Sequence, residues 1–232
     1  MKITYLSNYQ ELSVKAASIV AAEVQENPSL LFCAATGGSP TGMYQQMAQT
    51  PDLYTKIRIM KMDEWGIIPL SHPDSCESYL QKYVLEPLQV SADRYFGFDT
   101  KPSLVEQECE RMKGFIQQNG PLDVCILGLG KNGHIAFNEP AEQLNPYFHK
   151  AILAESTIQH DPALSAGEEP AYGLCVGMTE ILQSKKIIFL ATGKGKKAAI
   201  ERILTQKIGS DCPASFLWLH PNVECLIDET AL

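Results

Sequence analysis

Most of the chain alternates between short, largely apolar runs and longer segments of mixed polarity. The apolar runs have the length of β-strands and cover residues 3–6, 30–35, 57–62, 124–127, 187–191 and 223–227. Runs that stay apolar, instead of alternating with polar residues, are typical of strands buried on both faces. They predict the strands of a parallel sheet.

Between most of these runs, apolar residues recur at helical spacing. The clearest case, at steps of three and four, is the series Leu12, Ala16, Ile19, Val20 and Val24. This spacing places them on one face of an amphipathic helix, which Asn8 would cap and the Asn27-Pro28 pair would end. A second helix is predicted between Pro102 and Asn119. Strands that alternate with helices predict an α/β fold with helices on both faces of the sheet.

Length and composition fit a single domain covering residues 1–232. The chain is 45% hydrophobic and 20% charged, as ordinary globular proteins are. Its net charge is -8, from 27 acids and 19 bases, and basic residues gather in nothing longer than pairs. Nucleic acid and an anionic membrane surface are therefore not expected as partners, whereas a small anionic substrate needs only a few local cations. No apolar stretch reaches the ~18 residues of a membrane span.

The cysteines point to a reducing compartment. None of the seven forms a CxxC pair, and several lie within apolar runs such as SLLFCAA and DVCILG. Cysteines in such runs behave as small buried hydrophobes, and an odd, unpatterned count does not fit a disulfide framework. We therefore expect a cytoplasmic protein.

Four groups of unusual residues follow predicted strands, and ligands of parallel α/β sheets bind outside the carboxyl ends of the strands. The first group consists of Thr36, Gly37, Gly38 and Ser39. It precedes a helix predicted to begin near Pro40, and backbone amides and hydroxyls at a helix start suit a phosphate. Neither of the common glycine-rich nucleotide motifs is present. A plain strand-to-helix turn is the alternative.

The second and third groups carry acid–base residues. Asp63 and Glu64 follow the run 57–62, and a poorly solvated carboxylate at that position can act as a general base. After the run 124–127, Gly133 precedes His134, and Glu139 follows five residues later. Histidine exchanges protons near neutral pH, and a carboxylate can orient it. Acids that solvate a loop and a purely structural histidine are the alternatives.

The fourth group is a lysine cluster formed by Lys194, Lys196 and Lys197. Cations at the positive end of a helix are unfavourable unless an anion binds there, although exposed lysines on a solvated turn would also fit the pattern. Together the four groups indicate an enzyme that performs proton chemistry on a small phosphorylated compound.

At these residues the sequence resembles a known family. The segments ATGGSPTGMY, MDEWGIIPLSHPDSCESYL and LGLGKNGHIAFNEP and the lysines after Gly193 are similar to signatures of the glucosamine-6-phosphate deaminase/isomerase family. The triplet Asn138-Glu139-Pro140 separates the chain from the related 6-phosphogluconolactonases. The runs Asp63-Glu64-Trp65, Lys131-Asn132-Gly133-His134 and SFLWLH most resemble the galactosamine-6-phosphate deaminase/isomerases.

The resemblance implies a modified doubly wound, Rossmann-like fold and the conversion of a hexosamine phosphate to a ketose phosphate and ammonia, without metal or organic cofactor. Asp63 would move the proton between C2 and C1 of the sugar. His134, supported by Glu139, would open the pyranose ring. The residues that would contact the phosphate are Thr36, Gly37, Gly38, Ser39 and Lys196.

Two departures from the family pattern stand out. Asn132 occupies a position that is usually Asp, and an amide can hydrogen-bond an imidazole but cannot stabilise its cation by charge. The family also commonly adds an Arg to the phosphate site, and residues 142–170 contain none. The substitutes that the sequence offers are His149, Lys150 and His160.

Three functional hypotheses follow. The first is isomerisation with deamination, with galactosamine 6-phosphate favoured over its C4 epimer glucosamine 6-phosphate. The second is a lactonase-type hydrolase that uses His134 as a general base on water. The third is a non-catalytic sugar-phosphate sensor, which Asn132 keeps open. The sequence leaves the oligomeric state open, a homo-oligomer included.

Overall fold

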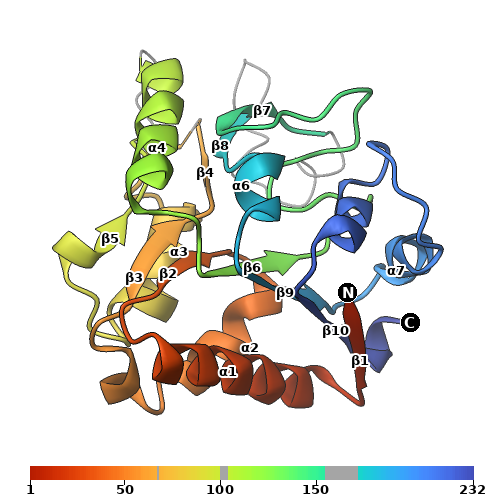
Figure 1. Ribbon diagram of the computed structural model, residues 1–232, viewed down its shortest axis with the longest axis horizontal. Coiled ribbons are helices and arrows are strands. Elements are labelled where there is room, and N and C mark those ends of the chain that lie inside the picture. Colours follow the sequence, from red (N-terminus) through yellow and green to blue (C-terminus); the bar gives the residue numbers. More distant parts are fainter. Residues whose placement is uncertain (67, 100–103, 155–171) are drawn as a thin grey trace.

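The computed structural model describes residues 1–66, 68–99, 104–154 and 172–232. Its centre is a seven-stranded sheet in the order β1-β10-β9-β6-β2-β3-β5, and every neighbouring pair is parallel (Figure 1). The strands are β1 (Lys2–Leu6), β2 (Leu31–Ala34), β3 (Arg58–Lys61), β5 (Tyr95–Phe96), β6 (Val124–Gly128), β9 (Lys186–Ala191) and β10 (Val223–Asp228). All six strands predicted from the apolar runs are present.

The helices lie on both sides of this sheet, so the fold class predicted from the sequence is confirmed. In Figure 1, α1 (Tyr9–Glu26) and α2 (Gly38–Met47) lie on one side, and α4 (Val105–Asn119) and α6 (Met178–Leu182) lie on the other. The remaining α-helices of the described residues are α3 (Cys76–Leu80) and α7 (Lys197–Leu204), and a π-helical turn, Gln81–Leu85, continues α3.

The first helix shows how the sequence pattern becomes structure. The side chain of Asn8 accepts a hydrogen bond from the backbone N–H of Glu11, at 2.9 Å, and so caps α1 as predicted. The helix ends before Asn27, and its apolar face is buried against the sheet and α2. The predicted second helix is α4, and the first two residues of its expected range lie outside the described residues.

A second, three-stranded sheet was not predicted. It is antiparallel and consists of β4 (Asp63–Trp65), β8 (Tyr172–Cys175) and β7 (His149–Ile152), in that order. Since β4 begins two residues after the end of β3, the small sheet lies next to the carboxyl edge of the parallel sheet. The buried apolar residues of both sheets belong to one continuous core.

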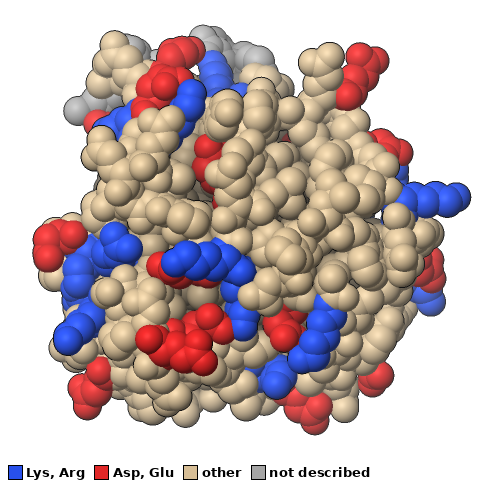
Figure 2. Space-filling model, in the orientation of Figure 1, with Lys and Arg blue, Asp and Glu red and all other residues tan. Residues whose placement is uncertain are grey.

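On the face shown in Figure 2, acidic and basic side chains are interspersed over a largely uncharged surface, and no continuous basic surface forms. Among the described residues, no helix is both long enough and apolar enough to cross a membrane.

Candidate active site

A cavity of about 520 Å³ lies at the carboxyl ends of β2 and β6. These two strands are neighbours in the sheet, and the chain proceeds outward from them in opposite directions, through β3 and β5 on one side and through β9 and β10 on the other. Ligands of doubly wound folds bind at such a reversal of strand order. The predicted site residues that line the cavity are Thr36, Gly37, Gly38, Ser39, Asp63, Asn132, His134 and Lys196.

The turn between β2 and α2 forms one wall. Gly37 adopts φ 94°, a left-handed conformation that favours glycine, and α2 begins at Gly38, with Pro40 as its third residue. The carbonyl oxygen of Gly37 accepts hydrogen bonds from the hydroxyls of Tyr79, at 2.8 Å, and Thr41, at 2.9 Å. The turn is thus held in place by its carbonyl groups, while the first amides of the helix have no acceptor within the helix. This arrangement suits an anion.

Asp63 supplies a carboxyl group with unusual surroundings. Its side chain is 5% exposed, and within the described residues its Oδ1 atom has no hydrogen-bond partner. Burial, followed by repulsion from Glu64, raises the pKa of Asp63 to about 7, against the lowering effects of Lys61 and Cys76. A carboxyl group that titrates near neutral pH is suited to accept and return a proton.

Glu64, its neighbour, serves the structure instead. It is completely buried and accepts hydrogen bonds from the backbone N–H groups of Cys76 and Glu77, at 2.9 and 2.8 Å. It also receives the Nζ of the equally buried Lys61 at 2.8 Å, and that lysine contacts Glu77 at 2.7 Å. Successive side chains of a strand point to opposite faces, so β4 directs Asp63 to the cavity and Glu64 to the start of α3.

The loop after β6 fixes the position of His134. Gly130 donates its backbone N–H to the carbonyl of His134 at 2.9 Å, and Gly133 has φ 93°. A Cβ atom at Gly130 would lie 2.4 Å from the His134 ring, so the loop can wrap around the ring only with glycine there. The Nδ1 atom of His134 lies 3.2 Å from Oε2 of Glu139, which orients the ring.

Asn132 does not contact the imidazole ring in the way that the sequence suggested. Its Nδ2 donates to Oε2 of Glu139 at 2.8 Å, and its Oδ1 accepts from the backbone N–H of His134 at 3.1 Å. Asn132 therefore helps to position Glu139 and the loop.

Of the three lysines predicted near α7, only Lys196 lines the cavity. It donates to the carbonyl oxygen of Leu129, and burial, followed by repulsion from Lys131, lowers its pKa. Lys197 instead lies 4.0 Å from Glu201 on the exposed face of α7. Lys194 is exposed and does not line the cavity.

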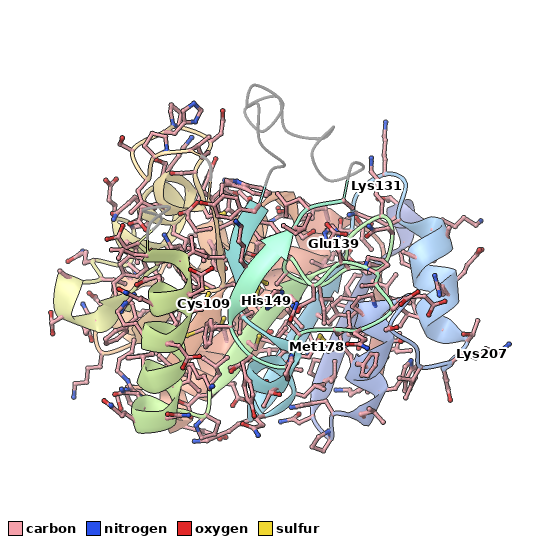
Figure 3. The ribbon with its side chains drawn as sticks, turned by 90° about the horizontal axis from the view of Figure 1, so that it is seen from above. Cys109, Lys131, Glu139, His149, Met178 and Lys207 are labelled. Atoms are coloured by element: carbon pink, nitrogen blue, oxygen red, sulfur yellow. The ribbon has the colours of Figure 1, made fainter. Side chains whose placement is uncertain are left out.

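The second cavity lysine, Lys131, was not assigned a role from the sequence. It lines the cavity, and its Cε atom would be 3.4 Å from a Cβ at Gly195, so the two lysine segments lie side by side. Figure 3 shows Lys131 and Glu139 on the loop that follows β6. The signal that could have identified Lys131 was its place directly after the glycine turn at a strand end.

Two of the three residues that the sequence offered in place of the missing phosphate-binding Arg do not lie at the cavity. His149 and Lys150 belong to β7 in the small sheet, and neither lines the cavity. The Nδ1 of His149 pairs with the carbonyl of Tyr147 at 2.9 Å, and Lys150 lies over the ring of Tyr172 at 4.1 Å. The third candidate, His160, lies outside the described residues.

Two aromatic residues in the cavity wall were also not assigned a role. Trp65 and Phe137 both line the cavity and stack on each other, with ring centroids 4.3 Å apart. No group of three or more His, Cys, Asp or Glu side chains in the described part of the chain is arranged to hold a metal ion.

Fold and cavity together define a class: a Rossmann-like α/β protein whose switch-point cavity is lined by a buried carboxyl group, a histidine, a glycine turn at a helix start and two lysines. The chain belongs to the family described as glucosamine-6-phosphate isomerases/6-phosphogluconolactonase, whose model matches residues 7–226. The family inferred from the sequence motifs is thereby confirmed.

Individual relatives cover nearly the whole chain. A putative deaminase AgaI from Escherichia coli K12 is 38% identical over 96% of this chain and 90% of its own length. A glucosamine-6-phosphate deaminase from Halothermothrix orenii is 35% identical over 100% of this chain and 98% of its own. The solved structure of a monomeric glucosamine-6-phosphate deaminase superposes with a TM-score of 0.92 at 33% identity, covering 100% of this chain and 98% of the other. A 6-phosphogluconolactonase from Trypanosoma brucei, with a TM-score of 0.77 at 22% identity over 98% of this chain and 96% of its own, shares the fold.

Proposed function

We propose that this protein is an aldose–ketose isomerase and deaminase that converts a hexosamine 6-phosphate and water to a ketohexose 6-phosphate and ammonia. The observation that carries the proposal is the shared cavity. The buried carboxyl of Asp63, whose pKa is raised to about 7, opens into the same space as His134, which Glu139 holds at 3.2 Å.

The phosphate would bind between the start of α2 and the two lysines. Thr36, Gly37, Gly38 and Ser39 offer amides and hydroxyls to the cavity, as the family resemblance implies. Lys131 and Lys196 add two positive charges, and burial, followed by the repulsion between the two lysines, lowers the pKa of Lys196. A dianion between two like charges relieves this repulsion, so the lysine pair favours a phosphate over a neutral ligand. Lys131 thereby takes the place of the missing Arg.

His134 would open the sugar ring. The imidazole moves a proton from the C1 hydroxyl to the ring oxygen, which breaks the bond between C1 and that oxygen and leaves an aldehyde at C1. Glu139 accepts a hydrogen bond from Asn132 at 2.8 Å, so its carboxylate is held in place beside Nδ1 of His134. A carboxylate beside that nitrogen can stabilise the protonated ring during the transfer.

Asp63 would then isomerise the open chain. Its carboxylate takes the C2 proton to give an enolate and returns the proton to C1, while a proton of the amine moves to the C1 oxygen, which leaves an imine at C2 and a hydroxymethyl group at C1. Water adds to the imine carbon, and ammonia leaves to give the ketone. The unpartnered Oδ1 atom of Asp63 suits this task, because no hydrogen bond has to be broken before it accepts the proton.

We further propose galactosamine 6-phosphate as the favoured substrate over glucosamine 6-phosphate, on the resemblance of the runs 63–65 and 131–134 to the galactosamine-6-phosphate deaminase/isomerases. The whole chain 1–232 would act as one domain, since both sheets share one core. A cytoplasmic location is supported by seven buried, free cysteines.

The test is an ammonia-release assay with the two hexosamine 6-phosphates side by side. We expect ammonia and ketohexose phosphate in equal amounts, faster from galactosamine 6-phosphate. The variant Asp63→Asn should still bind the substrate and release no ammonia. Absence of ammonia from both substrates, together with hydrolysis of 6-phosphogluconolactone, would replace the proposal by the lactonase hypothesis. Ligand-induced stabilisation without turnover of any of these compounds would favour the sensor.

A further inference from the structure

The short strand β4 places an aromatic ring beside the reactive carboxyl group. Asp63 and Trp65 are two residues apart, and residues at this spacing point to the same face of a strand. Both accordingly line the cavity, whereas Glu64 between them points away. Trp65 therefore lies about 7 Å from Asp63 along the same wall of the cavity, within the length of a sugar whose C1 and C2 atoms lie at Asp63.

The indole ring is held by a stack that depends on glycine. Trp65 stacks on Phe137 with an interplanar angle of 29°, and it pairs with Gly173 across the antiparallel ladder. A Cβ atom at Gly173 would lie 2.4 Å from the Phe137 ring, so only glycine leaves room for that ring behind the indole. Phe137 is 8% exposed, while Trp65 remains partly exposed in the cavity. We call the two rings the aromatic wall.

A partly exposed indole ring such as that of Trp65 favours contact with apolar groups of a ligand, because this contact removes apolar area from water. The two candidate sugars differ in what they can place there. In the galacto chair, the axial C4 hydroxyl projects from one face and leaves the C3, C4 and C5 hydrogens together on the other. In the gluco chair, the C4 hydrogen lies on the opposite face from those of C3 and C5, so the C3–C4–C5 edge carries an equatorial hydroxyl where the galacto ring has a third hydrogen.

We propose that Trp65, backed by Phe137, is the specificity-determining residue for the C4 configuration: the C–H face of a galacto-configured ring rests on its indole. The inference rests on the proposed function for the identity of the ligand. It assigns substrate selection to the aromatic wall and proton transfer to Asp63. One apolar contact of this kind supports discrimination of about tenfold.

Binding is tested with the unreactive analogues galactose 6-phosphate and glucose 6-phosphate, which lack the amine that the reaction releases. The chain has two tryptophans, and the other, Trp218, donates its Nε1–H to the carbonyl of Ile203 and does not line the cavity. The variant Trp218→Phe leaves Trp65 as the only indole reporter. We expect galactose 6-phosphate to change its fluorescence and to bind about tenfold more tightly than glucose 6-phosphate. Equal affinities with no change in emission would overturn the proposal.

Turnover provides the second measurement. We expect Trp65→Leu to reduce the ratio of the two kcat/KM values, galactosamine 6-phosphate to glucosamine 6-phosphate, to about 1, and Trp65→Phe to retain most of it. The affinity for inorganic phosphate, measured by calorimetry, should be unchanged in both variants if they are folded. An unchanged ratio in Trp65→Leu refutes the role of the wall and leaves the deaminase proposal intact. Conversely, the parent protein could bind galactose 6-phosphate more tightly than glucose 6-phosphate and release no ammonia from either hexosamine phosphate. This result would refute the deaminase proposal and leave the aromatic wall as a binding element.

Discussion

Replacing the buried Asp63 by asparagine should make the protein more stable, and the gain should increase with pH. The folded protein holds the proton of this carboxyl more tightly than the unfolded chain, because burial raises its pKa from 3.8 to about 7. A group with a raised folded pKa favours folding below its unfolded pKa, and this contribution is lost as the pH rises through the folded pKa. Asparagine does not ionise, so its contribution to the free energy of unfolding does not change with pH.

The magnitude follows from the two pKa values. Their difference corresponds to about 4 kcal/mol at about 1.36 kcal/mol per pKa unit, which is the upper limit of the effect at high pH. At about pH 5 the unfolded carboxyl is already ionised, and part of this free energy is already lost. Linkage between about pH 5 and about pH 8 therefore leaves a change of about 2.5 kcal/mol in the free energy of unfolding.

Urea unfolding of the parent protein and Asp63→Asn at these two pH values measures the effect. We expect the stability advantage of the variant to grow by about 2.5 kcal/mol towards the higher pH. The exposed Asp52, replaced by asparagine in the same way, serves as the control and should show no such growth. A stability difference for Asp63→Asn that is the same at both pH values would refute the raised pKa, and with it the physical basis for a base at this position.

Three further outcomes are expected. Gly130→Ala should lower kcat at least tenfold, since its Cβ would displace the His134 ring. Gly128→Ala, whose Cβ would lie 3.7 Å from its nearest neighbour, serves as the control and should have little effect, so equal rates for the two variants would contradict the packing argument. Lys196→Met should raise KM at least tenfold with a smaller change in kcat, and weaker inhibition by inorganic phosphate would confirm the cause. Asn132→Ala removes the amide that donates to Glu139 at 2.8 Å and should lower kcat with a smaller change in KM; an unchanged kcat would show that the carboxylate at position 139 keeps its place without this hydrogen bond.

The parallel sheet could be predicted because its strands are apolar along their whole length. Burial on both faces leaves a signal that each strand carries by itself. The rule that ligands bind at the carboxyl ends of such strands then located the turn at Gly37, the loop at His134 and Lys196 together. These parts of the site depend on local sequence and one general property of the fold.

The small antiparallel sheet could not be predicted in the same way. Its strand β4 has three residues, too few for a period to show, and its partner β8 lies more than a hundred residues further on. The pairing decides that Asp63 faces the cavity and Glu64 does not, a choice that adjacent acids leave open. The contact between Lys131 and the turn at Gly195 likewise joins residues far apart in the sequence, so the sequence of neither segment predicts it.

The most direct test of the account follows the C2 hydrogen of galactosamine 6-phosphate in heavy water by NMR. The parent protein should replace or transfer this hydrogen at the rate at which ammonia appears, and Asp63→Asn should leave it in place while the phosphate of the substrate still binds. Loss of the C2 hydrogen in the variant at the parental rate would contradict the claim that Asp63 is the base.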